Sequence, residues 1–422
     1  MDRGSIFHAV AVAATCWFVF VVHACGASRP LRDDHVVGSV TPAPVVQVGL
    51  SRCLRDPAVR IAVRGPWRLR GGAGVLSEGD AELDWTDVRA TPDGLSFGGR
   101  VWNETVLELA PRLDGTLEIE YARDLRGQPV RPTAVRYAGI FLIHRVGDAR
   151  LAVVNEVDLE TYLKGVVGKE MSLSEGVEAL KTQVVAARTY AVHEQRTGRL
   201  RRIRGERFDL YDDERSQAYG GLERHTDLAE RLVDETRGMF LVYEDRLVRA
   251  FYSAACGGAT EPAWEILGDE TEKMPPLSGV RCGYCERRPA HKWKEPAVIP
   301  KREISEKCLP PELRGAKVKS VAVTKTLPGG HALEVSVTLE NSSRVVVLQA
   351  HHEFKRQVTA RLRSTLWDVV EDRGDAIAIH GRGNGHGAGM CQVGAYEMAA
   401  DGKTAAEILE YYFPGARVKK LY

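Results

Sequence analysis

The sequence has no excess of charge of either sign. Its 422 residues include 58 Lys and Arg against 57 Asp and Glu, so bulk charge indicates neither a nucleic-acid partner nor an acidic tail. The chain also has no internal repeat and no low-complexity tract. Its apolar run at residues 9–22 is shorter than the ~20 residues that a membrane span needs. What is left is a globular chain long enough for a large core and two domains.

The short apolar run is typical of an export signal. After it, small Ala24 is followed by Cys25, an arrangement similar to a bacterial lipoprotein processing site. His23 fits that pattern poorly, so ordinary cleavage, an uncleaved anchor and lipidation at Cys25 all stay open. We therefore expect an exported protein, secreted or lipid-anchored, with a signal peptide or lipoprotein signal at residues 1–25. A polar, proline-containing linker follows at residues 26–45.

The sequence predicts an α+β fold in which the strands come first. At residues 46–150, short apolar segments alternate with Gly, Asp and Pro, which indicates a β-rich region. No reactive side chains gather there, so its role stays open. Residues 151–422 mix helical and strand patterns and are expected to form the functional domain. The predicted strands are "VQVGL", "VRIAVRG", "TLEIEYA", "GIFLIHRV" and "ARLAVVNEV".

The segment "SLSEGVEALKTQVVAARTYAVHEQ" has the pattern of a long helix. Ser172 and Glu175 have the spacing of a capping box, and apolar residues then recur on one face. Two pairs of larger side chains, each seven residues apart, project together from other faces. Further along, the sequence predicts a hairpin across Glu244 and Asp245 and a C-terminal helix that stops at Pro414. The apolar set is Leu180, Val184, Ala187 and Ala191, and the pairs are Lys181 with Arg188 and Gln183 with Tyr190.

The stretch "GRGNGHGAGMCQVGA", residues 381–395, has glycine at every second position up to Gly389. It is not a phosphate loop, because no lysine and hydroxyl residue follow the glycines. Cys391 and His386 could form the nucleophile and base of a cysteine peptidase, but the sequence offers no obvious third member. A close-packed turn explains the glycines. It does not explain His386 and Gln392 among them.

Two further features each permit two interpretations. Glu170 is either a general acid whose pKa is raised by apolar surroundings or a solvated carboxylate at the start of a helix. The basic run "RTGRLRRIRGER", residues 196–207, is either a solvated connector or a rim that attracts an anionic polymer. The residues alone do not decide between these interpretations.

Cys256, Cys282 and Cys285, with His291 nearby in the chain, are weak candidates for a metal site. A Cys-x-x-Cys pair and two further ligands can hold zinc in tetrahedral geometry, whereas an exported protein favours disulfides. A bond between Cys282 and Cys285 would close a very small loop. Cys256 bonded to either would close a loop of about thirty residues, which stabilises by roughly 3–4 kcal/mol. A Cys256 disulfide is therefore narrowly favoured over zinc, and no cofactor is expected.

Six segments together resemble the SpoIID/LytB family, which comprises stage II sporulation protein D and the amidase enhancer LytB. The segments occur in the family's order and span most of the chain, from about residue 151 to about residue 421. They are "AVVNEVDLETYLKGVVGKEM", "EALKTQVVAARTYAV", "FDLYDDERSQAYGG", "ETRGMFLVYEDRLVRAFYSAACGGATE", "GRGNGHGAGMCQVGAYEMA" and "ILEYYFPG".

The resemblance implies a protein of the bacterial cell envelope that acts on peptidoglycan. Stage II sporulation protein D is a lytic transglycosylase, a lyase that cuts glycan strands lacking stem peptides, and its catalytic glutamate matches Glu170. The glycine-rich stretch resembles a cleft wall whose bare backbone lets sugar rings lie close. The resemblance assigns substrate binding to Lys181, Gln183, Arg188, Tyr190, His386 and Gln392.

The resemblance also leaves alternatives. LytB-type members imply a glycan-binding module that stimulates a separate cell-wall amidase without cutting glycan itself. The zinc site of stage II protein D is not expected here, because Tyr211, Arg215 and Ser216 occupy the positions of its ligands. A link to sporulation stays open.

Overall fold

The computed structural model describes residues 44–124, 127–268, 272–340, 344–358 and 362–422. The predicted signal, Cys25 and all but the end of the predicted linker lie outside these residues. No helix in the described parts of the chain is long and apolar enough to span a membrane.

The first part of the described chain consists of two sheets whose strands are almost all antiparallel. Side chains from both sheets belong to one hydrophobic core. In the pairing of β2 with β9, Ile61 lies opposite Ile119 and Val63 opposite Leu117, and all four are fully buried. The first sheet has the order β13-β1-β12-β11-β8-β3-β4 and the second β10-β9-β2-β5-β6-β7. Their bounds are β1 Val45–Gly49, β2 Ala58–Arg64, β3 Trp67–Gly71, β4 Gly74–Gly79, β5 Leu83–Thr91, β6 Gly94–Phe97, β7 Arg100–Trp102, β8 Val106–Pro111, β9 Thr116–Arg123, β10 Pro129–Tyr137, β11 Ile140–Val146, β12 Arg150–Asp158 and β13 Leu210–Tyr211.

The β-rich region is confirmed, and each of the five predicted segments forms a strand: β1, β2, β9, β11 and β12. The last of them leads straight into helix α1, Leu159–Glu170. The turn between them is fixed by Asp158, whose Oδ1 accepts a hydrogen bond from the backbone N–H of Thr161 at 3.0 Å. This side chain satisfies one of the free amides at the helix N-terminus. Helix α1 ends at Glu170.

The long helix α2, Val177–Thr197, is confirmed, but it starts later than the sequence predicts. The predicted capping box does not form: Gly176 precedes the helix without a side-chain cap. The hydroxyl of Ser172 instead bonds that of Ser174 at 2.8 Å, and Glu175 pairs with Arg288 at 3.0 Å. The tertiary contact with Arg288 removes Glu175 from the local motif.

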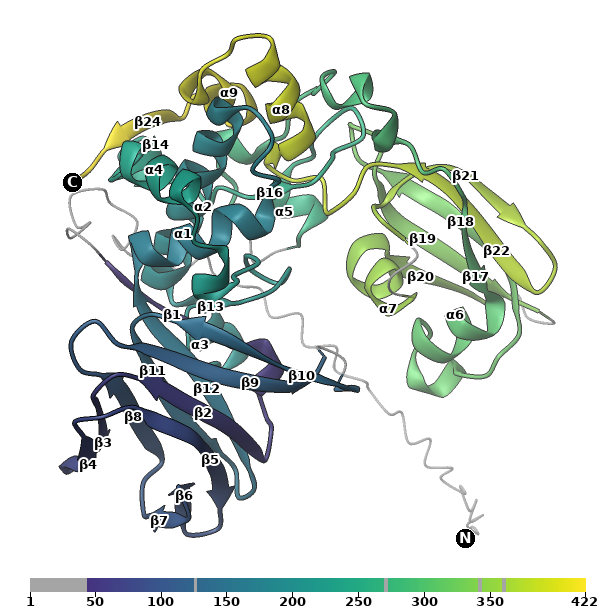
Figure 1. Cartoon of the computed structure of the whole chain (residues 1–422). Coiled ribbons are helices and arrows are strands. Elements are labelled where there is room, and N and C mark those ends of the chain that lie inside the picture. The colour runs from purple at the N-terminus through teal and green to yellow at the C-terminus, as the bar shows by residue number, and fades with distance from the viewer. Residues whose placement is uncertain (1–43, 125–126, 269–271, 341–343, 359–361) are drawn as a thin grey trace, which may run out of the picture. The chain divides into compact units, whose positions relative to one another are not determined.

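Helix α2 is the central element of the α+β part of the chain. The predicted apolar face is buried, and so are nearly all other residues from 179 to 194. Figure 1 shows helices α1, α4, α8 and α9 around it, and each of them contacts it. A helix enclosed on every side has no polar face left for solvent. The bounds of its neighbours are α3 Arg199–Arg204, α4 Asp227–Glu235, α8 Gln392–Ala400 and α9 Ala405–Tyr412.

The predicted hairpin and C-terminal helix are both present. Strands β14, Met239–Tyr243, and β15, Arg246–Leu247, are joined at Glu244 and Asp245, which have φ of 45° and 57°. Two positive φ values in a two-residue turn are typical of a tight β-hairpin. Helix α9 ends at Tyr412, two residues before Pro414. Strand β24, Arg417–Lys420, then pairs with β14 and completes a three-stranded sheet.

A second hydrophobic core lies in the segment from 297 to 379 and was not predicted. Two three-stranded sheets, β17-β22-β21 and β18-β19-β20, surround it with two short helices. The bounds are β17 Ala297–Pro300, α6 Lys301–Lys307, β18 Val318–Thr326, β19 Ala332–Leu339, β20 Val345–Gln349, α7 Arg356–Val358, β21 Leu366–Asp372 and β22 Ala376–Arg382. Strand β22 runs into the glycine-rich stretch. That stretch ends in β23, Met390–Cys391, which pairs in parallel with β16, Tyr252–Ser253.

Candidate functional site

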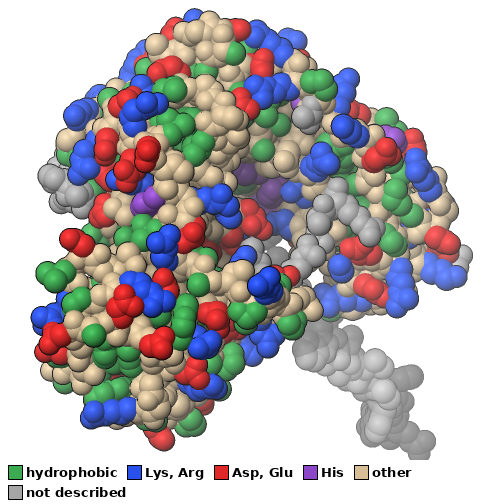
Figure 2. Space-filling view, viewed as in Figure 1, with side chains coloured by type: hydrophobic (Ala, Val, Ile, Leu, Met, Phe, Trp, Pro, Cys, Tyr) green, Lys and Arg blue, Asp and Glu red, His purple; other side chains and the backbone are tan. Residues whose placement is uncertain are grey.

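A pocket of about 260 Å³ collects side chains from segments far apart in the sequence. Figure 2 shows histidine side chains, in purple, set back between the blue side chains of Lys and Arg. The pocket is lined by residues from the end of α2, helix α3, the segment after β13, strand β16, the π-helix Ala350–Lys355 and the glycine-rich stretch. The lining includes Tyr190, Arg199, Arg204, Tyr211, Glu214, Arg215, Ser216, Arg249, Phe251, Tyr252, His351, His352, Arg356 and His386.

The lining is rich in positive charge. It contains five arginines and one carboxylate, Glu214. Arg249 and Arg199 both pair with the buried Glu194, at 2.7 and 2.9 Å. Arg215 pairs with Asp213 at 2.7 Å and lies 3.7 Å over the ring of Tyr211. The two remaining arginines are exposed side chains on α3 and α7. Clustered positive charge at a concave surface attracts anionic ligands.

His386 and His351 contribute polar atoms to the pocket rather than charge. Burial lowers the pKa of His386 to about 4, partly offset by a hydrogen bond with the backbone of Tyr252. Burial also lowers the pKa of His351 well below its usual value. Both rings are therefore neutral at pH 7. The Nδ1 of His386 accepts a hydrogen bond from the backbone N–H of Ala388 at 3.0 Å, which fixes the orientation of the ring.

Glu170 lies at the end of α1, half-buried, and its Oε1 accepts a hydrogen bond from the backbone N–H of Ala218. Burial raises the pKa of Glu170 above its usual value, and the negative charge of Glu214 raises it further. Hydrogen bonds from Ala218 and Tyr252 act in the opposite direction and lower the pKa. A carboxyl group with a raised pKa holds a proton at higher pH than an exposed one, as a general acid requires.

Half-buried Tyr252 connects Glu170 with the pocket, and the buried side chains of Gln217 and Tyr162 support it. Glu170 itself is not among the lining residues, but Tyr252 both lines the pocket and hydrogen-bonds the carboxylate. Gln217 donates from Nε2 to the hydroxyl of Tyr252 at 3.0 Å, and Tyr162 donates to Oε1 of Gln217 at 3.0 Å. Sequence reasoning did not single out Tyr252, Gln217 or Ala218. All three lie inside segments that carry the family resemblance, "FDLYDDERSQAYGG" and "RAFYSAACGG".

The predicted binding residues fall into three groups. Tyr190 and His386 line the pocket. Gln183 of α2 and Gln392 of α8 form a buried pair, in which Nε2 of Gln392 donates to Oε1 of Gln183 at 3.1 Å. Neither amide is among the residues that line the pocket. This pair joins the glycine-rich stretch to the central helix.

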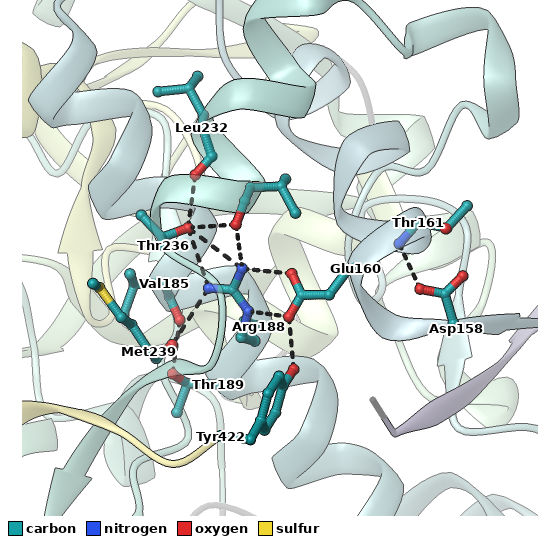
Figure 3. A network of polar contacts seen from close by, with 11 residues as sticks. Asp158, Glu160, Thr161, Val185, Arg188, Thr189, Leu232, Thr236, Met239 and Tyr422 are labelled. Carbon is teal, nitrogen blue, oxygen red and sulfur yellow. Dashed lines mark hydrogen bonds and ion pairs between the residues drawn. The ribbon is translucent and has the colours of Figure 1, made fainter. Parts of the chain in front are cut away.

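Arg188 and Lys181 lie outside the pocket, and both are held by carboxylates. Arg188 is fully buried and donates from Nε and a terminal nitrogen to Glu160, at 3.0 and 2.7 Å. Figure 3 shows this pair, with the hydroxyl of Tyr422 donating to the same carboxylate at 2.6 Å. Lys181 pairs with Glu235 at 2.8 Å. The pair therefore connects α2 and α1, and Glu160 also binds the C-terminal residue. No part of Arg188 is exposed for a ligand.

The glycines at 381–389 pack against protein rather than presenting bare backbone to the pocket. A Cβ at Gly385 would lie 2.6 Å from Cβ of Ser253, and one at Gly389 would lie 2.1 Å from the carbonyl oxygen of Phe251. Both glycines also have positive φ, 107° and 68°, which other residues rarely adopt. The close-packed turn thus explains the glycines, and the expected bare wall for sugar rings is not found. From this stretch, His386 is the side chain that lines the pocket.

A second cluster lies beside this turn. The sulfur atoms of Cys256, Cys282, Cys285 and Cys391 are buried and lie within 4.8 Å of one another. The sequence predicted three of these four. His291 is not among the clustered ligand atoms, and its Nδ1 lies 2.7 Å from the carbonyl oxygen of Arg288.

The residues of the predicted peptidase pair and those at the family's zinc position each make other contacts. Sγ of Cys391 accepts from the backbone N–H groups of Cys256 and Gly394, whereas His386 accepts from Ala388. Ser216 accepts from the backbone N–H of Tyr211 at 3.1 Å. Together with Arg215, these residues line the pocket.

Comparison with known proteins gives a consistent group of relatives. A family model described as "Stage II sporulation protein" matches residues 147–243. The chain is 31% identical over 284 residues to an uncharacterized protein of Brachyspira hyodysenteriae. The aligned region covers 67% of this chain and 72% of that protein. It is 29% identical over 289 residues to stage II sporulation protein D of Bacillus subtilis, covering 63% and 76%. It is 25% identical over 290 residues to the amidase enhancer of the same organism, covering 60% of this chain and 39% of the relative.

The matched region contains the elements that build the site. Residues 147–243 include α1 with Glu170, the central helix α2, and Gln217 and Ala218. The longer matches to the relatives extend well beyond that region. The chain belongs to the SpoIID family of stage II sporulation proteins.

Proposed function

We propose that this protein is an exported lytic transglycosylase of the bacterial cell envelope that cuts peptidoglycan strands lacking stem peptides. The observation that carries this proposal is Glu170, a half-buried carboxyl group whose pKa is raised. It is fixed by Ala218 and joined to a basic pocket through Tyr252. The similarity to stage II sporulation protein D supports the same assignment.

In the proposed reaction a single carboxyl group acts twice. Protonated Glu170 gives its proton to the glycosidic oxygen as that bond breaks and positive charge develops on the sugar ring. The resulting carboxylate then takes the proton of the same sugar's 6-hydroxyl, whose oxygen closes a 1,6-anhydro ring. The donated proton is thereby replaced, and no water is consumed. A typical glycoside hydrolase instead needs two carboxyl groups at a set separation.

The charge of the pocket supports an anionic substrate. When a stem peptide is removed from muramic acid, the amide is replaced by a free lactyl carboxylate. A strand without stem peptides therefore carries a negative charge on every second sugar. Arg204 and Arg356, exposed in the lining, are suited to pair with such carboxylates. The basic run at 196–207 contributes Arg199 and Arg204 to this lining, which favours the anion-attracting interpretation of that run.

The proposal is tested by digesting peptide-free glycan and measuring product masses. The unaltered protein should release anhydro-ended fragments, and Glu170→Gln should lose this activity while keeping its fold and its affinity for glycan. Glu230→Gln is a matched control, because Glu230 lies on α4 outside the pocket and pairs with Lys164 at 3.5 Å. Full activity of Glu170→Gln, or no anhydro products from the unaltered protein, would contradict the proposal.

Similarity to the amidase enhancer favours a second function. In that case the same pocket binds glycan without cutting it, and the protein stimulates a cell-wall amidase. Glycan binding without turnover, together with amidase stimulation that survives Glu170→Gln, would select this function. Loss of stimulation in Glu170→Gln would argue against it.

A further inference from the structure

Four cysteines from three separate segments meet beside the glycine-rich turn. Cys256 follows β16, Cys282 and Cys285 lie in the loop before β17, and Cys391 ends β23. Their sulfur atoms are within 4.8 Å of one another, and all four residues are buried. We propose that these four cysteines bind one zinc ion as a tetrathiolate and thereby fasten the turn that carries His386.

The spacing of the sulfur atoms fits a single tetrahedral ion. Sγ of Cys256 and Sγ of Cys285 are 3.6 Å apart. Two thiolates bound to one zinc at about 2.3 Å in tetrahedral geometry lie about 3.8 Å apart. An iron–sulfur cluster places several metal and sulfide atoms between its thiolates and needs a wider cage. The 3.6 Å separation and the 4.8 Å limit on the whole set of sulfur atoms are therefore those of a mononuclear site.

The surroundings supply hydrogen bonds to thiolate sulfur. The backbone N–H groups of Cys256 and Gly394 each donate to Sγ of Cys391 at 3.3 Å. The hydroxyl of Tyr412 lies 3.1 Å from Sγ of Cys282. Such outer contacts orient metal ligands and stabilise their charge.

The fourth sulfur changes the choice that the sequence left between zinc and a disulfide. With three cysteines, a disulfide from Cys256 closes the longest loop and so stabilises the folded state most. With Cys391 as a fourth, the set has the Cys-x-x-Cys spacing and ligand number of a structural zinc site. Cys282 and Cys285, which gain little from a mutual disulfide, become useful as neighbouring ligands. The described cysteines outside the cluster are Cys53 and Cys308, and both are buried apart from it. Burial alone therefore does not explain why the other four cysteines lie together.

An ion at this position would hold the pocket wall together. Cys391 lies opposite Ser253 in the parallel pairing of β23 with β16, next to the pair Tyr252 and Met390. Zinc would link this ladder to the loop that carries Cys282. The ion would therefore keep Tyr252 and His386 in place without contacting the substrate. This role is independent of whether the pocket cuts glycan or only binds it.

The test uses the full chain purified without added metal or chelating resin. We expect about one equivalent of zinc by elemental analysis, and four thiols that react only after the ion is removed by a chelator in denaturant. Exchange with Co²⁺ should give the visible absorption of a tetrahedral tetrathiolate. Chelator should also lower the melting temperature. These measurements are made on the unaltered protein and do not depend on a variant that folds.

Variants then assign the ligands. Cys391→Ala should lose the stoichiometric zinc and the cobalt spectrum, whereas Cys53→Ala and Cys308→Ala should keep both. Four thiols missing in denaturant without reductant, with no bound metal, would show two disulfides and overturn the proposal. Stoichiometric iron would overturn the choice of zinc. Unchanged metal content in Cys391→Ala would overturn the ligand set.

Discussion

Arg188 on α2 and Glu160 on α1 form a bidentate ion pair, and their side chains are 0% and 4% exposed. The guanidinium also lies within 3.4 Å of the hydroxyl of Thr236 and of the carbonyl oxygen of Met239. A buried charge whose partner is removed is left uncompensated in a medium of low dielectric constant. The pair therefore fixes the central helix α2 against α1. Glu170 is the last residue of α1.

Replacing Arg188 by leucine should lower the free energy of unfolding by about 3–5 kcal/mol, because Glu160 would lose its buried partner. Lys181→Leu is the control, since Lys181 pairs with the partly exposed Glu235 and such pairs contribute about 0–1 kcal/mol. Urea denaturation of both variants measures the difference. The double variant Arg188→Leu with Glu160→Leu should lose less than the sum of the single changes. Equal losses for Arg188→Leu and Lys181→Leu would show that the pair is not a structural tie.

If Glu170 is the general acid of the proposed cleavage, its environment determines how that cleavage depends on pH. Burial raises its pKa, and its first step as an acid requires the protonated form. Activity should therefore be present below this raised pKa and fall as the pH rises through it. The hydrogen bond from Tyr252 lowers the pKa. In Tyr252→Phe the pKa should rise further, so the fall in kcat/KM should move to higher pH.

This shift is measured as kcat/KM against pH, with Tyr243→Phe as the control. Tyr243 lies on β14, away from the pocket lining, and its replacement should leave the profile in place. A shift of the Tyr252→Phe profile to lower pH would contradict the acid role, because the variant removes an interaction that stabilises the carboxylate. A uniform loss of activity at every pH would assign Tyr252 to positioning alone.

Local patterns predicted those elements whose residues decide their own structure. Strands β2 and β9 come from short segments rich in apolar residues, and those apolar residues supply most of the buried positions in each strand. The hairpin at Glu244 and Asp245 needs only a two-residue turn between two apolar runs. Helix α9 carries its own capping box at Thr404 and Glu407. In the hairpin and in α9, the interactions that fix the element lie within a few residues of one another.

Contacts between distant residues could not be predicted in the same way. The capping box at Ser172 and Glu175 has the right spacing, but Glu175 is taken by Arg288, 113 residues away. Periodicity placed Arg188 on a helix face without showing that this face is buried against α1. Sγ of Cys391 accepts a hydrogen bond from the backbone N–H of Cys256, 135 residues away in the sequence. No local spacing pattern predicts this contact. The family resemblance predicts a catalytic role for Glu170, whereas only the fold places Tyr252 beside it.

The arginines in the lining should make binding of peptide-free glycan sensitive to salt. Arg204 and Arg356 are exposed charges in a concave surface, and salt screens such charges over about 8–10 Å. Arg204→Gln and Arg356→Gln should each weaken binding roughly 2- to 5-fold at low ionic strength, the range of a partly exposed ion pair. The double variant should show a smaller dependence of Kd on salt, because fewer ion pairs form with the lactyl carboxylates.

Arg302→Gln provides the matched control. Its side chain is 87% exposed on α6 and pairs with Glu306, so the same net charge is lost away from the pocket. If binding depends on the local field of the pocket, this variant should retain both the affinity and the salt dependence of the unaltered protein. If all three single variants weaken binding equally, long-range net charge and not the pocket is responsible. Titration of peptide-free glycan at two ionic strengths separates these outcomes, and Glu170→Gln can be used throughout so that no substrate is cut during the measurement.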